Sequence, residues 1–139
     1  MPVDRERIVY LLGEIEKALN ILKEFQKEEK EKIIGDVKTL GSVKYYFIVA
    51  MEGCIDVGNH ILSREHGGVP ESYADGFILL GERGTIPENL AQNLANMAKF
   101  RNLLVHLYWK VDDERLYQIL QSQLSDIDAF IDCIAKKYL

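Results

Sequence analysis

The sequence is short of the residues that interrupt helices or cross-link small folds, since its 139 residues include three prolines, ten glycines and two cysteines. It also lacks any apolar run near the roughly 18 residues that a membrane-spanning helix requires. The first residues are charged and lead directly into an amphipathic pattern, which is not the pattern of a signal peptide. Cys54 and Cys133 show no CxxC spacing, so we expect reduced thiols. These absences predict a cytoplasmic protein that needs no membrane, disulfide or metal ion to fold.

Positive charge is also in deficit, because 17 lysines and arginines are outnumbered by 22 aspartates and glutamates, which gives a net charge of −5. A protein that binds nucleic acid through a broad basic surface has the opposite balance. This argues against a general nucleic-acid binder but is compatible with a local cationic patch. The length fits a single domain, residues 1–139, that buries a core large enough to fold unaided.

Strand-like alternation is absent, and apolar residues recur instead at helical spacing, as Ile8, Leu11, Leu12, Ile15 and Leu19 do along one helix face. The same spacing predicts long helices at about 4–31, 42–64, 87–104 and from 112 onward, with a short helix at 73–80. The sequence therefore predicts an all-α protein, an antiparallel four-long-helix bundle with one additional short helix. The helix at 42–64 is apolar around most of its circumference, so we expect it to lie at the bundle centre or to face a second subunit as well.

The segment from Arg101 to Tyr108 departs from this regular pattern. Arg101 and Asn102 precede three apolar residues, and His106, Tyr108 and Trp109 follow. On an unbroken helix, Arg101 and His106 would point roughly 140° apart, because five residues turn the chain by about 500°. The two side chains converge only if the helix ends or loosens near residue 105. A helix end that carries a guanidinium, an imidazole and a phenol is suited to phosphate chemistry.

The pattern Arg-x4-His-x-Tyr, with the polar Asn102 after the arginine, resembles the signature of the HepT-like branch of the HEPN family. The resemblance extends over nearly the whole chain, through Asp56-Val57-Gly58-Asn59-His60, Pro70, Tyr73, Phe77, Ile86-Pro87, Met97 and Val111-Asp112. It implies the HEPN fold and a metal-independent endoribonuclease without a cofactor. It further implies a toxin that works as a homodimer, with the motifs of both subunits facing one cleft. The implied partner is an MNT-type nucleotidyltransferase antitoxin, which silences the toxin by transferring AMP to Tyr108.

The residue types agree with that chemistry. His106 suits the proton transfers of RNA cleavage because an imidazole titrates near neutral pH. Arg101 suits the phosphate because its planar donors match two oxygens. A dimer would supply each residue twice, and an AMP group on Tyr108 would place a bulky anion beside Arg101. We expect Asn102, Asp56 and His60 to support this site.

Simpler interpretations stay open for each residue. Arg101 could pair with a carboxylate at a helix end, His106 could be a core histidine, and Tyr108 could pack beside Trp109. The polar stripe formed by Glu52, Asp56, Asn59 and His60 could orient His106 or bind RNA, although we favour a solvated face or an intersubunit hydrogen-bond network. Cys54, His60 and His66 are six residues apart, which scatters them around a helix and predicts no metal site.

Two functions of different classes follow. The first is a ribonuclease toxin with His106 as acid and base and Arg101 as phosphate clamp. The alternative is a non-catalytic subunit that binds a nucleotide or serves as the docking and acceptor partner of a nucleotidyltransferase. The intact motif favours the enzyme, whereas the acidic composition slightly favours the binding subunit.

Overall fold

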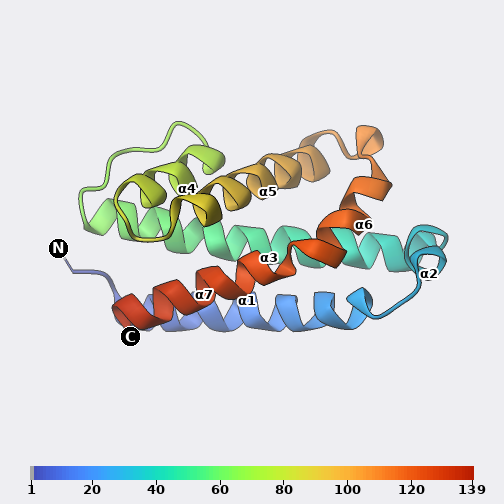
Figure 1. Cartoon of the computed structure of the whole chain (residues 1–139), viewed down its shortest axis with the longest axis horizontal. Coiled ribbons are helices and arrows are strands. Elements are labelled where there is room, and N and C mark those ends of the chain that lie inside the picture. The colour runs from blue at the N-terminus through green and yellow to red at the C-terminus, as the bar shows by residue number, and fades with distance from the viewer. Residues whose placement is uncertain (1) are drawn as a thin grey trace.

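The computed structural model describes residues 2–139, apart from the side chain of Tyr108. The regular elements of this part of the chain are all helical, which confirms the predicted all-α class (Figure 1). They are α1 (Arg5–Gln26), α2 (Lys30–Ile34), α3 (Val37–Arg64), α4 (Tyr73–Glu82), α5 (Glu88–His106), the 3-10 turn η1 (Tyr108–Lys110), α6 (Asp113–Ser122) and α7 (Leu124–Tyr138).

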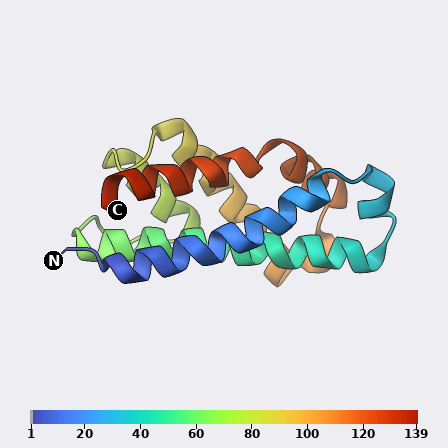
Figure 2. The same ribbon diagram turned by 90° about the horizontal axis from the view of Figure 1, so that it is seen from below.

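The four longest helices, α1, α3, α5 and α7, alternate in direction and form the predicted bundle (Figure 1). Figure 2 shows α1 lying along α3, and both chain termini lie at the same end of the molecule. Two glycines permit the closest helix contacts. A Cβ on Gly53 would lie 2.4 Å from Cγ1 of Ile15 on α1, and one on Gly81 would lie 2.6 Å from Cβ of Ala91 on α5. Side chains larger than hydrogen at these positions would separate the helices.

The core runs the length of the bundle and is apolar throughout its centre. Two edge-to-face phenylalanine pairs, Phe47 with Phe100 and Phe77 with Phe130, each have ring centroids 5.9 Å apart. This geometry places the positive ring edge of one phenylalanine against the negative face of the other. The first pair joins α3 to α5 and the second joins α4 to α7. The first pair therefore packs together the two helices that carry the predicted residues Asp56 and Arg101.

The helix predicted at residues 4–31 is interrupted after α1. α1 ends at Gln26, and the separate helix α2 follows with the buried Ile33. The charged stretch between them contains no proline or glycine, so no local signal marks the break. The turn allows α2 to pack against α3 and α6. Burial of Ile33 by this turn explains why the amphipathic pattern of α1 does not continue to residue 31.

The expected last helix is divided into α6 and α7 at Gln123. The amide of Gln26 donates to the carbonyl oxygens of Leu120 and Gln121 at 3.0 and 3.2 Å. The Gln121 amide returns a bond of 3.1 Å to the carbonyl oxygen of Gln26. These bonds satisfy carbonyls at the end of α6. The division is therefore supported by contacts between residues about 95 positions apart in the sequence.

The beginning of α3 also lies earlier than expected, at Val37 instead of Ser42. Asp36 caps the helix, since its carboxylate accepts from the Lys38 N–H at 3.3 Å. Gly41, which precedes the predicted start of this helix, lies inside the helix. Within the described residues, no helix is both long enough and apolar enough to cross a membrane.

Candidate active site

The motif occupies the C-terminal end of α5. Pro87 was predicted to be the first residue of this helix, and in the structure it is the N-cap, one position earlier than the first helical residue. The helix stays regular through His106, because the Leu107 N–H still donates to the Leu103 carbonyl at 2.9 Å. The loosening near residue 105 that would let Arg101 and His106 converge is therefore not observed, and the two side chains leave α5 on different sides.

Arg101 is directed into the bundle, with 7% of its surface exposed. Its guanidinium forms an ion pair with Glu52 of α3, and its Nη1 donates to Oδ1 of Asn102 at 3.0 Å. The Tyr73 ring of α4 covers it, with 5.3 Å between Cζ and the ring centroid. Three helices therefore fix one side chain, and the expected support from Asn102 is a direct hydrogen bond.

The ion pair is unequal in its exposure. The Arg101 side chain is 9% exposed, whereas that of Glu52 is 52% exposed. A buried guanidinium requires a partner because removal from water is costly. The Nε–H of Arg101 is buried and has no acceptor within the described part of the chain. Arg101 therefore pairs with a carboxylate, as the simpler interpretation predicted. Its Nε–H is still available to donate a hydrogen bond.

A small hollow of about 220 Å³ adjoins this pair, lined by Glu52, Ile55, Asp56, Tyr73 and Arg101. Asp56 lies one turn beyond Glu52 on α3 and is exposed. Partial burial and then the charge of Glu52 raise the pKa of the Asp56 carboxyl, and Arg7 and Arg101 oppose that shift. Asp56 is thus part of the electrostatic surroundings of Arg101.

His60 serves a different part of the fold. Its Nε2 accepts a hydrogen bond of 2.9 Å from the backbone N–H of Asp4, the N-cap of α1. Burial lowers the pKa of the His60 imidazole, and the charges of Arg64 and Arg7 add to this effect, while Asp4 opposes it. The described contacts of His60 therefore attach the start of α1 to α3, and they do not reach the motif.

The end of α5 presents apolar side chains to solvent together with His106. The exposed large apolar residues of this segment are Leu103, Val105, Leu107 and Trp109. The backbone of Tyr108 begins η1, two residues beyond His106, whereas its side chain lies outside the described residues. The motif thus divides into a buried cation and an exposed imidazole that lies among apolar neighbours.

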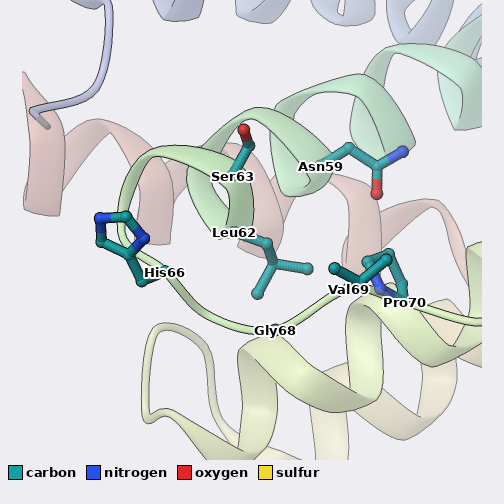
Figure 3. A pocket seen from close by; sticks show the side chains of 7 residues that line it. All are labelled: Asn59, Leu62, Ser63, His66, Gly68, Val69 and Pro70. Carbon is teal, nitrogen blue, oxygen red and sulfur yellow. The ribbon is translucent and has the colours of Figure 1, made fainter.

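A larger hollow, of about 660 Å³, lies at the end of α3 beside the loop of residues 65–72 (Figure 3). In this view the side chain of Leu62 points toward Val69 and Pro70, and the His66 ring lies apart from them. None of the motif residues lines this hollow. Among the described residues, no three histidine, cysteine or acidic side chains are grouped to hold a metal ion.

Sequence reasoning did not assign Glu52 and Tyr73 to the site, although the structure places both against Arg101. Glu52 belonged to the polar stripe on α3, and Tyr73 belonged to the wider family resemblance. The sequence separation of Glu52 and Arg101 is 49 residues, so helical periodicity contains no sign of their contact. The one signal for Glu52 in the sequence was an acidic residue on an otherwise apolar helix.

Comparison with known proteins places this arrangement in a family. The profile of the family described as ribonuclease HepT-like matches residues 15–134. The chain belongs to the HepT-like ribonuclease family. Its enzyme class is accordingly that of the endoribonucleases.

Two curated HepT proteins are similar to the chain. The mRNA nuclease HepT of Shewanella oneidensis is 37% identical over 83 residues, which cover 60% of this chain and 62% of that protein. The match thus spans slightly less than two thirds of the relative. The tRNA nuclease HepT of Aphanizomenon flos-aquae is 24% identical over 130 residues, which cover 94% of this chain and 86% of that protein.

A solved structure shares the whole fold. It is a tri-AMPylated HEPN toxin of Shewanella oneidensis in complex with an MNT antitoxin, with a TM-score of 0.87 and 28% identity. The superposition covers 94% of this chain and 97% of that one. A second solved toxin–antitoxin complex, which contains AMP-PNP, has a TM-score of 0.88 and 27% identity. The fold of this HepT-like chain is therefore that of HEPN toxins.

Proposed function

We propose that this HepT-like protein is the ribonuclease toxin of a toxin–antitoxin pair and that it cleaves RNA without a metal ion. The observation that carries this proposal is Arg101, a guanidinium held by three helices at the buried side of a motif whose histidine is exposed. Related chains of this family are named as mRNA and tRNA nucleases. The class of substrate is therefore RNA.

The chemistry requires a proton acceptor, a proton donor and a positive charge. A neutral His106 imidazole removes the proton of a ribose 2′-hydroxyl as its oxygen attacks the neighbouring phosphorus. The bond to the 5′-oxygen then breaks, and an imidazolium returns a proton to that leaving group. Arg101 neutralises the charge that gathers on the phosphoryl oxygens during the exchange. The products are a 2′,3′-cyclic phosphate and a free 5′-hydroxyl.

Two copies of the chain complete this site in the proposed mechanism. Arg101 and His106 leave one α5 on different sides, and within the described residues no hydrogen bond joins them. The mechanism needs two proton-transfer groups, and each protomer offers one motif histidine. The apolar side chains exposed around His106, namely Leu103, Val105, Leu107 and Trp109, provide a surface for a second copy. We therefore propose a homodimer with both motifs at its cleft.

The proposed control is the transfer of AMP to Tyr108 by an MNT-type nucleotidyltransferase antitoxin. The solved Shewanella toxin is tri-AMPylated and bound to an MNT antitoxin. The backbone of Tyr108 lies directly after the end of α5 in this chain, two residues from His106. A phosphodiester on its phenol would bring negative charge to the segment that carries the motif and would repel RNA.

The test is cleavage of a mixed RNA pool in EDTA by the parent protein and by His106→Ala. We expect the parent to cleave and the variant to lose activity by about a hundredfold or more, with unchanged helical circular dichroism because His106 is exposed. His66→Asn is the matched control, because it removes another exposed imidazole at a backbone φ of 53° that asparagine tolerates. Equal cleavage by the parent and by His106→Ala would remove His106 from the mechanism.

A second experiment separates the toxin from the alternative of a non-catalytic acceptor subunit. Tyr108→Phe should take up no labelled AMP from the partner nucleotidyltransferase but should retain RNA cleavage. Undiminished labelling of this variant would place the modification on another residue. If a dimeric parent of unmodified mass cleaves no RNA and yet accepts AMP, the acceptor function is correct and the nuclease proposal is wrong.

A further inference from the structure

We infer that Glu52 is a positioning residue of the ribonuclease site: it sets the orientation of Arg101 and balances its charge until RNA binds. This inference rests on the proposed function, because it assigns Arg101 to the phosphate. It adds a residue of α3 to a motif that otherwise lies within residues 101–108 of the sequence. Glu52 itself contacts the guanidinium and is not assigned a contact with RNA.

The contacts around Arg101 leave little freedom for its guanidinium. Glu52 engages Nη2, Asn102 accepts from Nη1, and the Tyr73 ring lies against the guanidinium. The group has five N–H donors, and these two bonds leave donors for an anion. Because Glu52 accepts from Nη2 of Arg101, its carboxylate determines the direction in which the remaining N–H groups of the guanidinium point.

The exposure of the pair shows which partner depends on the other. Arg101 is nearly buried, whereas Glu52 is half exposed and could be solvated by water without this contact. Arg101 has no comparable access to water. Removal of the Glu52 carboxylate would therefore change the surroundings of Arg101 more than those of residue 52. An alanine at an exposed position within α3 is also compatible with the helix.

Glu52 has opposite effects on binding and on turnover. Its negative charge beside Arg101 repels a phosphate, so its removal should maintain or strengthen RNA binding. Its loss also frees the guanidinium to move, and a displacement of about 1 Å from the productive geometry costs on the order of a hundredfold in rate. A general loss of structure would weaken binding and turnover together, so a divergence of the two identifies a positioning role.

The first experiment reports on Arg101 without any need for catalysis. The parent and Glu52→Ala are treated with phenylglyoxal, and modification of Arg101 is followed by peptide mass spectrometry. We expect Arg101 of the variant to react at least several times faster than in the parent. Asp132→Asn on α7 is the control for the loss of one negative charge, since Asp132 is exposed on another helix. Equal reactivity in the parent and Glu52→Ala would overturn the inference.

The second experiment measures kcat with a cleavable RNA and Kd with the same RNA carrying a 2′-deoxy substitution at the cleavage site. Glu52→Ala should lower kcat by about tenfold to a hundredfold and leave Kd unchanged or lower. In an Arg101→Lys background, the same change at Glu52 should lower kcat no further, because it acts through the lost guanidinium. A full additional loss in that background would overturn the positioning role.

The two arms separate this inference from the proposed function. A parent protein that cleaves no RNA, but whose Arg101 becomes reactive in Glu52→Ala, would contradict the ribonuclease assignment and support the positioning of Arg101. An active parent whose kcat and Arg101 reactivity are both insensitive to Glu52→Ala would support the ribonuclease and overturn the positioning role.

Discussion

The two halves of α5 expose opposite kinds of residue to water. Through its first three turns the helix buries apolar side chains, including Leu90, Leu94 and Ala98, as expected of an amphipathic helix. At its C-terminal end Phe100 and Leu104 stay buried, but Arg101 is buried with them while Leu103 and Val105 are exposed. The same helix therefore packs apolar side chains into the core along its first turns and exposes apolar side chains to solvent at its C-terminal end.

Under the proposed function, this difference marks the part of the fold that gives up stability to form a catalytic site. Buried charge and exposed apolar groups are both unfavourable for an isolated protomer. Both are explained if the end of α5 is completed by a second copy of the chain and by an RNA phosphate. The following predictions test whether the two halves of α5 differ in this way.

The largest expected effect is on stability, from one leucine in each half. Leu94→Ala should lower the free energy of unfolding by about 2–5 kcal/mol, because Leu94 is fully buried. Leu103→Ala should lower it by about 0.5 kcal/mol, since 38% of its surface is already exposed. Urea denaturation at concentrations that favour the monomer measures both. Similar losses from the two variants would show that the halves do not differ.

An intermediate effect is expected on assembly. Val105→Glu should raise the dimer dissociation constant by about tenfold or more, which corresponds to about 1.4 kcal/mol, because it places a charge on the surface proposed to meet a second copy. Val9→Glu on α1 is the matched control, since Val9 is 52% exposed and remote in sequence from the motif. Light scattering across micromolar concentrations distinguishes them. A parent that stays monomeric in this range would contradict the shared cleft.

The smallest expected effect concerns His60 and the pH dependence of stability. The folded pKa of its imidazole is lowered, so the folded state favours the neutral ring that accepts the Asp4 N–H. Its stabilising contribution is complete above the unfolded value near 6.5 and is lost as the pH falls through the folded pKa. His60→Gln should reduce the stability at pH 8 by about 1 kcal/mol and should remove this component of the acid destabilisation.

The comparison of parent and His60→Gln denaturation at pH 8 and pH 5 isolates that component from other titrating groups. The raised pKa of the Asp56 carboxyl acts in the opposite direction, because the folded state then binds a proton more readily than the unfolded state. If the two proteins lose the same stability between pH 8 and pH 5, the hydrogen bond of His60 to Asp4 does not control the pH dependence.

Sequence patterns predicted the long helices well where a single helix face meets the core. The spacing of Ile8, Leu11, Leu12 and Ile15 on α1 is local, and these residues are all buried. The break after Gln26 and the division at Gln123 were missed because neither has a local signal. Both depend on contacts that form only after folding, namely the burial of Ile33 and the reciprocal bonds of Gln26 and Gln121.

The candidate site shows the same division between local and distant information. His106 lies five positions after Arg101, and the helical angle predicted that the two side chains diverge on an unbroken helix. The bond from Arg101 to the adjacent Asn102 is also local. His60 was expected to support the site as part of the polar stripe that includes Asp56, but its ring contacts the start of α1. Proximity along a helix did not determine which neighbouring helix that side chain meets.

The sequence by itself determined the helical class, the faces of the long helices and the motif that identifies the family, because these depend on residues within two turns of one another. The tertiary structure decided that Arg101 is buried, that Glu52 and Tyr73 hold it, and that His106 stays at the surface. These outcomes depend on how α3, α4 and α5 pack together. A buried guanidinium must find a partner wherever the fold supplies one, and here the carboxylate comes from a helix 49 residues away.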